Sequence, residues 1–252
     1  MSEHDPAPEP SRHSSPRTRR SPEIQAEAAT RDRSPLALLW YRLVQRVTGI
    51  LFAIFCQMRA TGRNHVPKSG GALLVSNHIS HLDVFLLGLP LERPLNYVAR
   101  STLFLPGLGF LIRSVGGFAI QREGMGASGL KETLRRIRAG GIVTLFPEGT
   151  RSRDGELAEL KSGIAVLAAR ARVPIIPAAV AGTFEAWPRN GLLPRPHPIR
   201  VHYGSPIQPA EIAAMSAEDV TALIRTRILE CQSDARQALR RSLGWCPSKA
   251  VD

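Results

Sequence analysis

The sequence predicts an α/β fold, in which a mostly parallel β-sheet is covered by helices and is preceded by an amphipathic, membrane-associating helix. The first reason is that short apolar runs alternate with helical patterns from Gly71 onward, which is typical of parallel strands joined by helices. The second is that 252 residues with 43% apolar content can bury one substantial core. The third is that polar motifs directly follow apolar runs, where a parallel sheet presents catalytic side chains.

The N-terminal arm, residues 1–34, is expected to be disordered. It carries six Arg and six Asp or Glu, many Pro and Ser, and almost no large apolar side chains, so it cannot offset its ordering entropy. We expect an amphipathic segment over residues 35–62, the α/β domain over residues 63–210, and a C-terminal helix and tail over residues 211–252. Because the arm is charge-balanced, the net charge of +12 lies in the rest of the chain.

A helix is expected over residues 36–58, with polar and apolar residues on different sides. Its polar stripe comprises Arg42, Gln45, Arg46 and Gly49. The longest charge-free run, residues 47–58, has 12 residues, whereas about 20 are needed to cross a bilayer. We therefore expect the helix to lie in the interface, on the cytoplasmic face of the membrane. A tilted span and a core helix of a soluble protein remain as alternatives.

The other elements follow in order along the chain. Apolar runs predict strands at residues 72–76, 95–99, 117–121, 142–146, 175–180 and 199–203. Helical patterns predict helices at residues 81–89, 103–115, 128–139 and 164–172. A last, long helix begins at Ser216-Ala217-Glu218-Asp219, which is similar to a capping box, and continues to about residue 243. We expect this last helix to be structural.

Charge and cysteine usage limit the possible function classes. A strongly basic domain suits nucleic acid, anionic lipid headgroups or phosphorylated substrates, and charge alone does not choose between them. Cys56, Cys231 and Cys246 show no paired spacing, which argues against a disulfide framework or structural zinc and fits a reducing, cytosolic setting. The N-terminus lacks the pattern of a secretory signal, so no export is expected.

The most informative motif contains His78 and Asp83, directly after the predicted strand at residues 72–76. A histidine can accept a proton near neutrality, and a carboxylate can orient its ring and stabilise the imidazolium. Their spacing requires the carboxylate to fold back onto a histidine in the turn. The alternative is that Ser80 and Asp83 cap a helix and that the histidine lies on the surface. His81 is a competing base.

The sequence contains no Gly-x-Ser-x-Gly elbow or other evident nucleophile, so we expect the hydroxyl of a substrate to attack. The run at residues 146–152 follows another predicted strand and has the pattern of a tight turn. Gly149 permits an unusual backbone conformation there, and Arg151 offers a bidentate fork to a phosphate. The alternative is an ordinary loop with an exposed arginine.

Residues 124–129 match the glycine fingerprint of dinucleotide-binding proteins, between a predicted strand and a predicted helix. In that fingerprint the tight turn starts directly at the strand end. Here Arg122 and Glu123 lie between the strand and the first glycine, so we favour a flexible loop.

Four blocks occur in the order seen in the glycerolipid acyltransferase family, which the chain resembles over residues 36–207. They are residues 77–83, 116–122, 146–152 and 173–177. The resemblance implies that His78 deprotonates the free hydroxyl of a lysophospholipid and that Asp83 orients the ring. The alkoxide would then attack the thioester carbonyl of an acyl donor, while Arg122 and Arg151 hold the acceptor phosphate.

Further substrate-binding residues follow from the same resemblance. Glu148, Gly149 and Thr150 match positions tied to acceptor binding, and Lys161 lies in a segment similar to the family's Phe-Lys-x-Gly, with Leu160 as a departure. Arg100 stands where many members have lysine, which keeps the charge but changes the geometry. Gln121 replaces a common acidic residue. The chemistry needs no metal or other cofactor.

The function implied is acyl transfer from acyl-CoA or acyl carrier protein to lysophosphatidic acid, giving phosphatidic acid. The expected partners are the lysophospholipid acceptor, one of these donors and an anionic membrane surface, and not nucleic acid. The nearest alternative is the same chemistry on another lysolipid, such as lyso-ornithine lipid. A non-enzymatic basic protein that binds membranes or nucleic acid would leave the ordered motifs unexplained.

Overall fold

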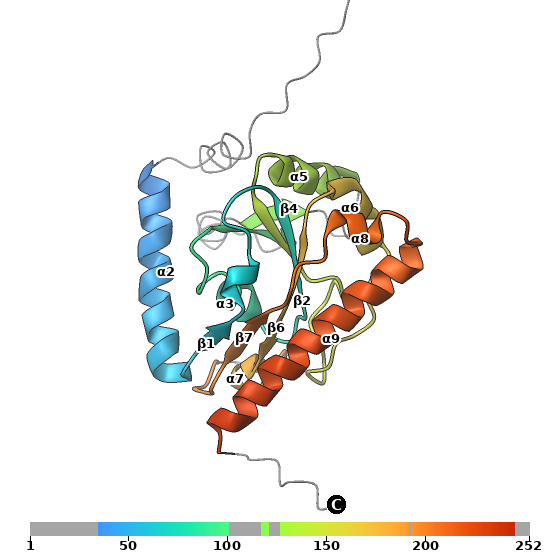
Figure 1. Cartoon of the computed structure of the whole chain (residues 1–252). Helices are drawn as coiled ribbons and strands as arrows, with labels where there is room; N and C mark the ends of the chain where they lie inside the picture. The colour runs from blue at the N-terminus through green and yellow to red at the C-terminus, as the bar shows by residue number, and fades with distance from the viewer. Residues whose placement is uncertain (1–34, 101–116, 121–126, 192, 245–252) are drawn as a thin grey trace, which may run out of the picture.

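The computed structural model describes residues 35–100, 117–120, 127–191 and 193–244 (Figure 1). They form a seven-stranded sheet in the order β1-β7-β6-β2-β5-β3-β4, in which β6 and β7 are antiparallel and the other neighbours are parallel. The α/β fold with a mostly parallel, helix-covered sheet is therefore confirmed. The strands are β1 (Arg59–Thr61), β2 (Ala72–Ser76), β3 (Leu95–Arg100), β4 (Gly117–Ile120), β5 (Ile142–Leu145), β6 (Ile175–Ala181) and β7 (Arg200–Tyr203).

Helices cover both faces of this sheet. They are α2 (Pro35–Cys56), α3 (Asp83–Leu86), α5 (Ala127–Arg138), α6 (Gly163–Ala171), α7 (Thr183–Ala186), α8 (Pro209–Ile212) and α9 (Ala217–Ser242), with one 3-10 turn at Arg63–His65. The predicted helix at residues 81–89 is shorter in the structure, because residues 80–82 are bends before α3 and residues 87–90 form a turn after it. The predicted helix at residues 103–115 lies outside the described residues. The sequence did not predict β1, α7 or α8, whose three or four residues are too few to show a periodicity.

The core contains two large apolar clusters, one on each face of the sheet, and a small third cluster of Ala181, Ala235 and Leu239. In β2, Leu73 and Val75 point to one face and Leu74 to the other, as the two-residue period of a strand requires. The first cluster is covered by α5, α6 and α9, and the second by α3 and α7. Every residue of the central strands β2, β5 and β6 is buried, which is usual for parallel strands with helices on both sides.

The C-terminal helix α9 runs diagonally across β6 and β7 (Figure 1). The main-chain N–H of Asp219 donates to the hydroxyl of Ser216 at 3.1 Å, so the predicted start of this helix is confirmed. Val220, Ile224 and Ile228 follow at intervals of four residues and enter the first apolar cluster. The helix is therefore part of the same core as the sheet.

Helix α2 stands beside the domain with most of its large apolar side chains facing outward (Figure 1). Leu39 is 65% exposed and Ile54 is 66% exposed. The inward side contains Gln45, whose amide donates to the carbonyls of Gly88 at 2.8 Å and Leu91 at 2.7 Å. A core helix would show the opposite arrangement, with apolar residues inward, so that alternative does not describe α2.

Asn77 directly follows β2 and joins the carboxyl end of this strand to β6. Its side-chain amide donates to the carbonyl of Val180 at 3.0 Å, and its oxygen accepts from the N–H of Val180 at 2.9 Å. Asn77 is completely buried. The side chain thus continues the β2–β6 ladder for one further pair of hydrogen bonds, at the point where the main chain turns away toward His78.

We expect Asn77→Ala to destabilise the protein, because it leaves two buried main-chain groups unpaired at about 1–3 kcal/mol each. Urea unfolding followed by circular dichroism measures the change. Asn64→Ala is the matched control, since Asn64 is exposed. Equal unfolding midpoints for the two variants would show that the Asn77 bridge contributes nothing.

Candidate active site

The histidine and aspartate predicted as a base and its partner lie in direct contact. Nδ1 of His78 is 3.0 Å from Oδ2 of Asp83. The carboxylate is completely buried, whereas the histidine side chain keeps 17% of its surface exposed. The predicted fold-back of Asp83 onto His78 is therefore confirmed. With Nδ1 as the donor to the carboxylate, the lone pair lies on Nε2, the nitrogen that remains for a substrate.

The carboxylate of Asp83 has four hydrogen-bond partners, because a buried charge must be compensated. The main-chain N–H groups of Ile79 and Ser80 each donate to Oδ2 at 2.7 Å. The hydroxyl of Thr183 donates to Oδ1 at 2.7 Å. These donors lie in the turn before α3 and at the start of α7, so Asp83 organises the turn that carries His78. It does not act as the N-cap of a helix.

Ser80 also has a structural place in this turn. Its hydroxyl donates to the carbonyl of Trp187 at 2.8 Å and accepts from the N–H of Leu82 at 3.3 Å. Both contacts of the hydroxyl are therefore with main-chain groups. His81, the competing base, is tilted against the Trp187 ring at 5.2 Å. Burial lowers the pKa of His81, and the positive charge of Arg151 lowers it further.

The turn at residues 146–152 packs directly against His78. The Phe146 ring stacks on the imidazole, with centroids 4.0 Å apart and planes at 19°. The N–H of His78 donates to Oε1 of Glu148 at 2.7 Å, and its carbonyl accepts from the N–H of Ser152 at 2.7 Å. The histidine is therefore fixed through its ring and through both polar groups of its main chain.

Glu148, which the resemblance assigned to acceptor binding, accepts hydrogen bonds from the main chain. It is 3% exposed, and its second oxygen, Oε2, accepts from the N–H of Ala158 at 2.9 Å. Burial raises the pKa of Glu148, and the hydrogen bonds from Ala158 and His78 oppose that shift. In this geometry Glu148 joins His78 to the segment that follows the turn at residues 146–152.

Gly149 and Lys161, which the resemblance assigned to substrate binding, lie together. Gly149 has a φ of 69°, and a Cβ on it would meet Cε of Lys161 at 2.6 Å and Nζ at 2.8 Å. A glycine therefore allows the ammonium group to approach the turn. The N–H of Lys161 donates to the carbonyl of Pro147 at 3.0 Å, which fixes its main chain there. Thr150, between Gly149 and Arg151, is exposed.

Arg151 is half-buried and exchanges hydrogen bonds with the loop after α7. Its Nη1 donates to the carbonyl of Arg189 at 3.5 Å, and Nη1 of Arg189 donates to the carbonyl of Arg151 at 3.1 Å. The side chain of Arg100 and all of Arg122 lie outside the described residues. The structure thus brings His78, Asp83 and Arg151 into one region and leaves the two other predicted arginines undescribed.

The sequence did not identify Thr183, Trp187 or Arg189 as parts of this region. Thr183 follows the apolar strand β6, and the same signal, a polar residue just past a strand, marked His78. Applied to β6, that signal would have found Thr183. In the described residues, no group of three or more His, Cys, Asp or Glu could hold a metal ion.

Comparison with known proteins identifies the family. Residues 57–181 match the family model described as Acyltransferase, and the chain therefore belongs to the acyltransferase family of enzymes. Among its relatives, it is 32% identical over 171 residues to a 1-acyl-sn-glycerol-3-phosphate acyltransferase of Limnanthes douglasii, covering 66% of this chain and 60% of the relative. A protein of the same description from Cocos nucifera is 34% identical over 141 residues, covering 54% and 46%.

A bacterial relative and a solved structure extend this comparison. The 1-acyl-sn-glycerol-3-phosphate acyltransferase of Bacillus subtilis (strain 168) is 24% identical over 204 residues, which cover 78% of this chain and 99% of that protein. The fold is also similar to the crystal structure of the 1-acyl-sn-glycerophosphate (LPA) acyltransferase PlsC from Thermotoga maritima. The TM-score is 0.66 at 22% identity, covering 83% of this chain and 81% of the other. The chain spans only about half to three fifths of the two plant relatives.

We expect Thr183→Val to lower the rate of acyl transfer about tenfold or more and the free energy of unfolding by about 1–3 kcal/mol, because it removes a donor to a buried carboxylate without changing the side-chain shape. Thr183→Ser retains the hydroxyl and should restore the rate. Steady-state kinetics and thermal unfolding of both variants test the role. A serine variant as slow as the valine variant would mean that packing, and not the hydroxyl, is what matters.

Proposed function

We propose that the protein transfers a fatty acyl group from an acyl thioester to the hydroxyl of lysophosphatidic acid, giving phosphatidic acid. The observation that carries the proposal is the buried Asp83 carboxylate on Nδ1 of His78, which leaves Nε2 as a base. The names of the relatives support the choice of acceptor, and the basic side chains of Arg151, in the turn bonded to His78, and of Lys161, beside Gly149 of that turn, suit a phosphate.

In the proposed mechanism, Nε2 of His78 removes the proton of the acceptor hydroxyl as the oxygen attacks the thioester carbonyl. Asp83 stabilises the imidazolium that forms. The tetrahedral intermediate then collapses, the carbon–sulfur bond breaks, and the thiolate takes the proton from the imidazolium. No covalent acyl-enzyme is required, which agrees with the structural contacts that occupy Ser80.

Binding of the acceptor phosphate is assigned to the arginines. Arg151 lies in the turn that is bonded to His78, so a phosphate on its guanidinium would bring the neighbouring hydroxyl toward the base. By resemblance, Arg122, Arg100 and Lys161 assist, together with the main chain of Gly149 and Thr150. Glu148 acts as a positioning residue for His78. Another lysolipid with the same hydroxyl chemistry is the nearest alternative acceptor.

Helix α2 is the proposed membrane contact. In the described residues it is the single helix long and apolar enough to cross a bilayer, by length and composition, over Leu39–Cys56, and only 11% of that window is buried. Its outward apolar residues and the exposed Arg42 and Arg46 suit a helix that lies among anionic headgroups at the cytoplasmic face. Both the acceptor and the product are lipids, so such a position gives access to both.

We expect His78→Ala to lower kcat for acyl transfer to lysophosphatidic acid by about 10²–10⁴-fold, the usual contribution of a general base. Transfer is measured with labelled acyl-CoA and with acyl-loaded carrier protein in detergent micelles. His81→Ala is the matched control and should retain activity. If His81→Ala abolishes transfer and His78→Ala does not, the base is His81. A folded wild-type protein that is inert with both donors contradicts the proposed acceptor.

We expect the protein to float with vesicles that contain phosphatidylglycerol. Leu43→Gln with Val47→Gln should weaken binding at least about tenfold, because burying one such side chain contributes about 1.5–3 kcal/mol. Leu229→Gln, an exposed apolar residue of α9, is the control. Alkaline carbonate should release a helix that lies in the interface. Resistance to carbonate would indicate that α2 spans the bilayer.

A further inference from the structure

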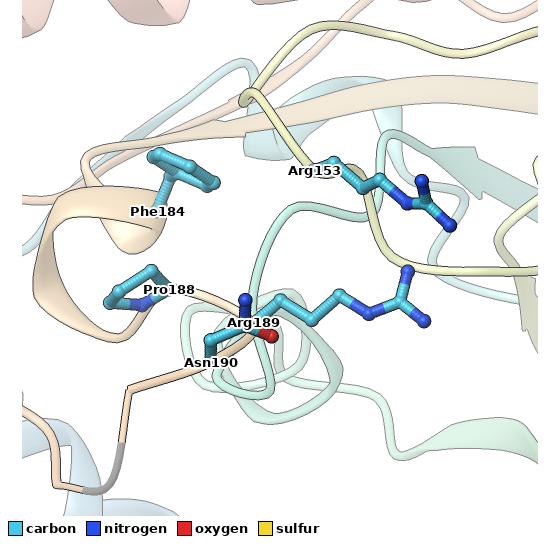
Figure 2. Close-up of a pocket in the computed structure, with 5 residues that line it drawn as sticks. All are labelled: Arg153, Phe184, Pro188, Arg189 and Asn190. Carbon is cyan, nitrogen blue, oxygen red and sulfur yellow. The ribbon is translucent and has the colours of Figure 1, made fainter.

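A cavity of about 550 Å³ lies beside the turn at residues 146–152 (Figure 2). It is lined by Arg153, Phe184, Pro188, Arg189 and Asn190. The first of these lies in the loop after β5, and the others lie in α7 and the loop that follows it. None of the five was assigned to the acceptor, so the cavity is a second place where a substrate could bind.

Two arginines give this cavity its charge. Figure 2 shows the side chains of Arg153 and Arg189 extending in the same direction, away from Phe184 and Pro188. Among the described residues, neither guanidinium pairs with a carboxylate. Nη1 of Arg189 donates to the carbonyl of Arg151, which holds the side chain in place but does not neutralise it. Two uncompensated guanidinium groups favour an anion with several oxygens, such as a phosphate or pyrophosphate.

The rest of the lining suits a flat heteroaromatic ring. Phe184 offers a ring for stacking, and Pro188 offers a flat apolar surface. The amide of Asn190 has both donors and an acceptor, the combination that matches the hydrogen-bonding edge of adenine. The volume is that of a small-molecule site. Phosphate groups next to a purine define a nucleotide as the class of ligand.

The cavity and the catalytic pair share the segment from Thr183 to Arg189. Thr183 bonds Asp83, and the carbonyl of Trp187 accepts from Ser80. The next residue, Pro188, already lines the cavity. A ligand with a nucleotide in the cavity can therefore extend a flexible arm along this segment toward His78.

We propose that this cavity binds the nucleotide end of coenzyme A, its adenosine 3′-phosphate and pyrophosphate, so that the acyl donor is acyl-CoA. The inference rests on the proposed function, which requires a thioester donor but does not specify its carrier. An acyl carrier protein presents the same thioester on a pantetheine arm with one phosphate and no adenosine. It would leave the ring-binding part of the cavity without a ligand.

The first test is the KM for each substrate. Arg153→Gln removes a side chain exposed at the cavity and should raise the KM for acyl-CoA about tenfold or more, the effect of one charge-assisted hydrogen bond. The KM for lysophosphatidic acid should stay the same. Arg189→Lys is the second variant, and Arg170→Gln, an exposed arginine of α6, is the matched control. An unchanged KM for acyl-CoA, or a change only in the KM for the acceptor, overturns the proposal.

The second test does not depend on the acceptor. Adenosine 3′,5′-bisphosphate, the nucleotide part of the donor without its arm, should bind the wild-type protein in calorimetry, compete with acyl-CoA, and bind Arg153→Gln about tenfold more weakly. Absence of binding at millimolar concentration overturns the cavity assignment, even if acyl transfer is observed with acyl carrier protein. Binding of the bisphosphate by a protein that is inert with lysophosphatidic acid keeps the cavity assignment and rejects the acceptor.

Discussion

The buried carboxylate of Asp83 is the constraint on which the rest of the site depends. A charge without solvent contact would cost several kcal/mol, so it must be matched by donors. Those donors are the main chain of the turn at residues 79–80, the ring of His78 and the hydroxyl of Thr183. One side chain thus shapes the turn, sets the ring nitrogen that faces the substrate, and connects the end of β2 to the start of α7.

A second buried carboxylate supports the other side of the same turn. Glu148 accepts from the main chain of His78 and of Ala158, while Ser152 donates to the carbonyl of His78. The histidine therefore depends on a segment seventy residues away as much as on its own neighbours. This explains in physical terms why the two motifs occur together: each completes the hydrogen bonds of the other.

Much of this could be predicted from the sequence where the signal is local. The strand at residues 72–76, the N-cap Ser216 and the contact of His78 with Asp83 follow from apolar runs, capping patterns and short spacing. A polar residue just past β6 marks Thr183 as a candidate, but its hydrogen bond to Asp83 and the main-chain role of Glu148 could not be predicted, because both depend on contacts between distant segments. The short strand β1 likewise depends on its pairing with the distant strand β7.

The outward apolar side of α2 has a kinetic consequence under the proposed function. An enzyme held on a bilayer meets its lipid acceptor by diffusion in two dimensions, so the quantity that governs its rate is the mole fraction of acceptor in the membrane. Gln45 attaches α2 to the carbonyls of Gly88 and Leu91, a few residues after Asp83, so the helix holds the active site at the bilayer. Because the rate depends on the mole fraction of acceptor, dilution of the acceptor with inert lipid would slow the enzyme even at constant bulk concentration.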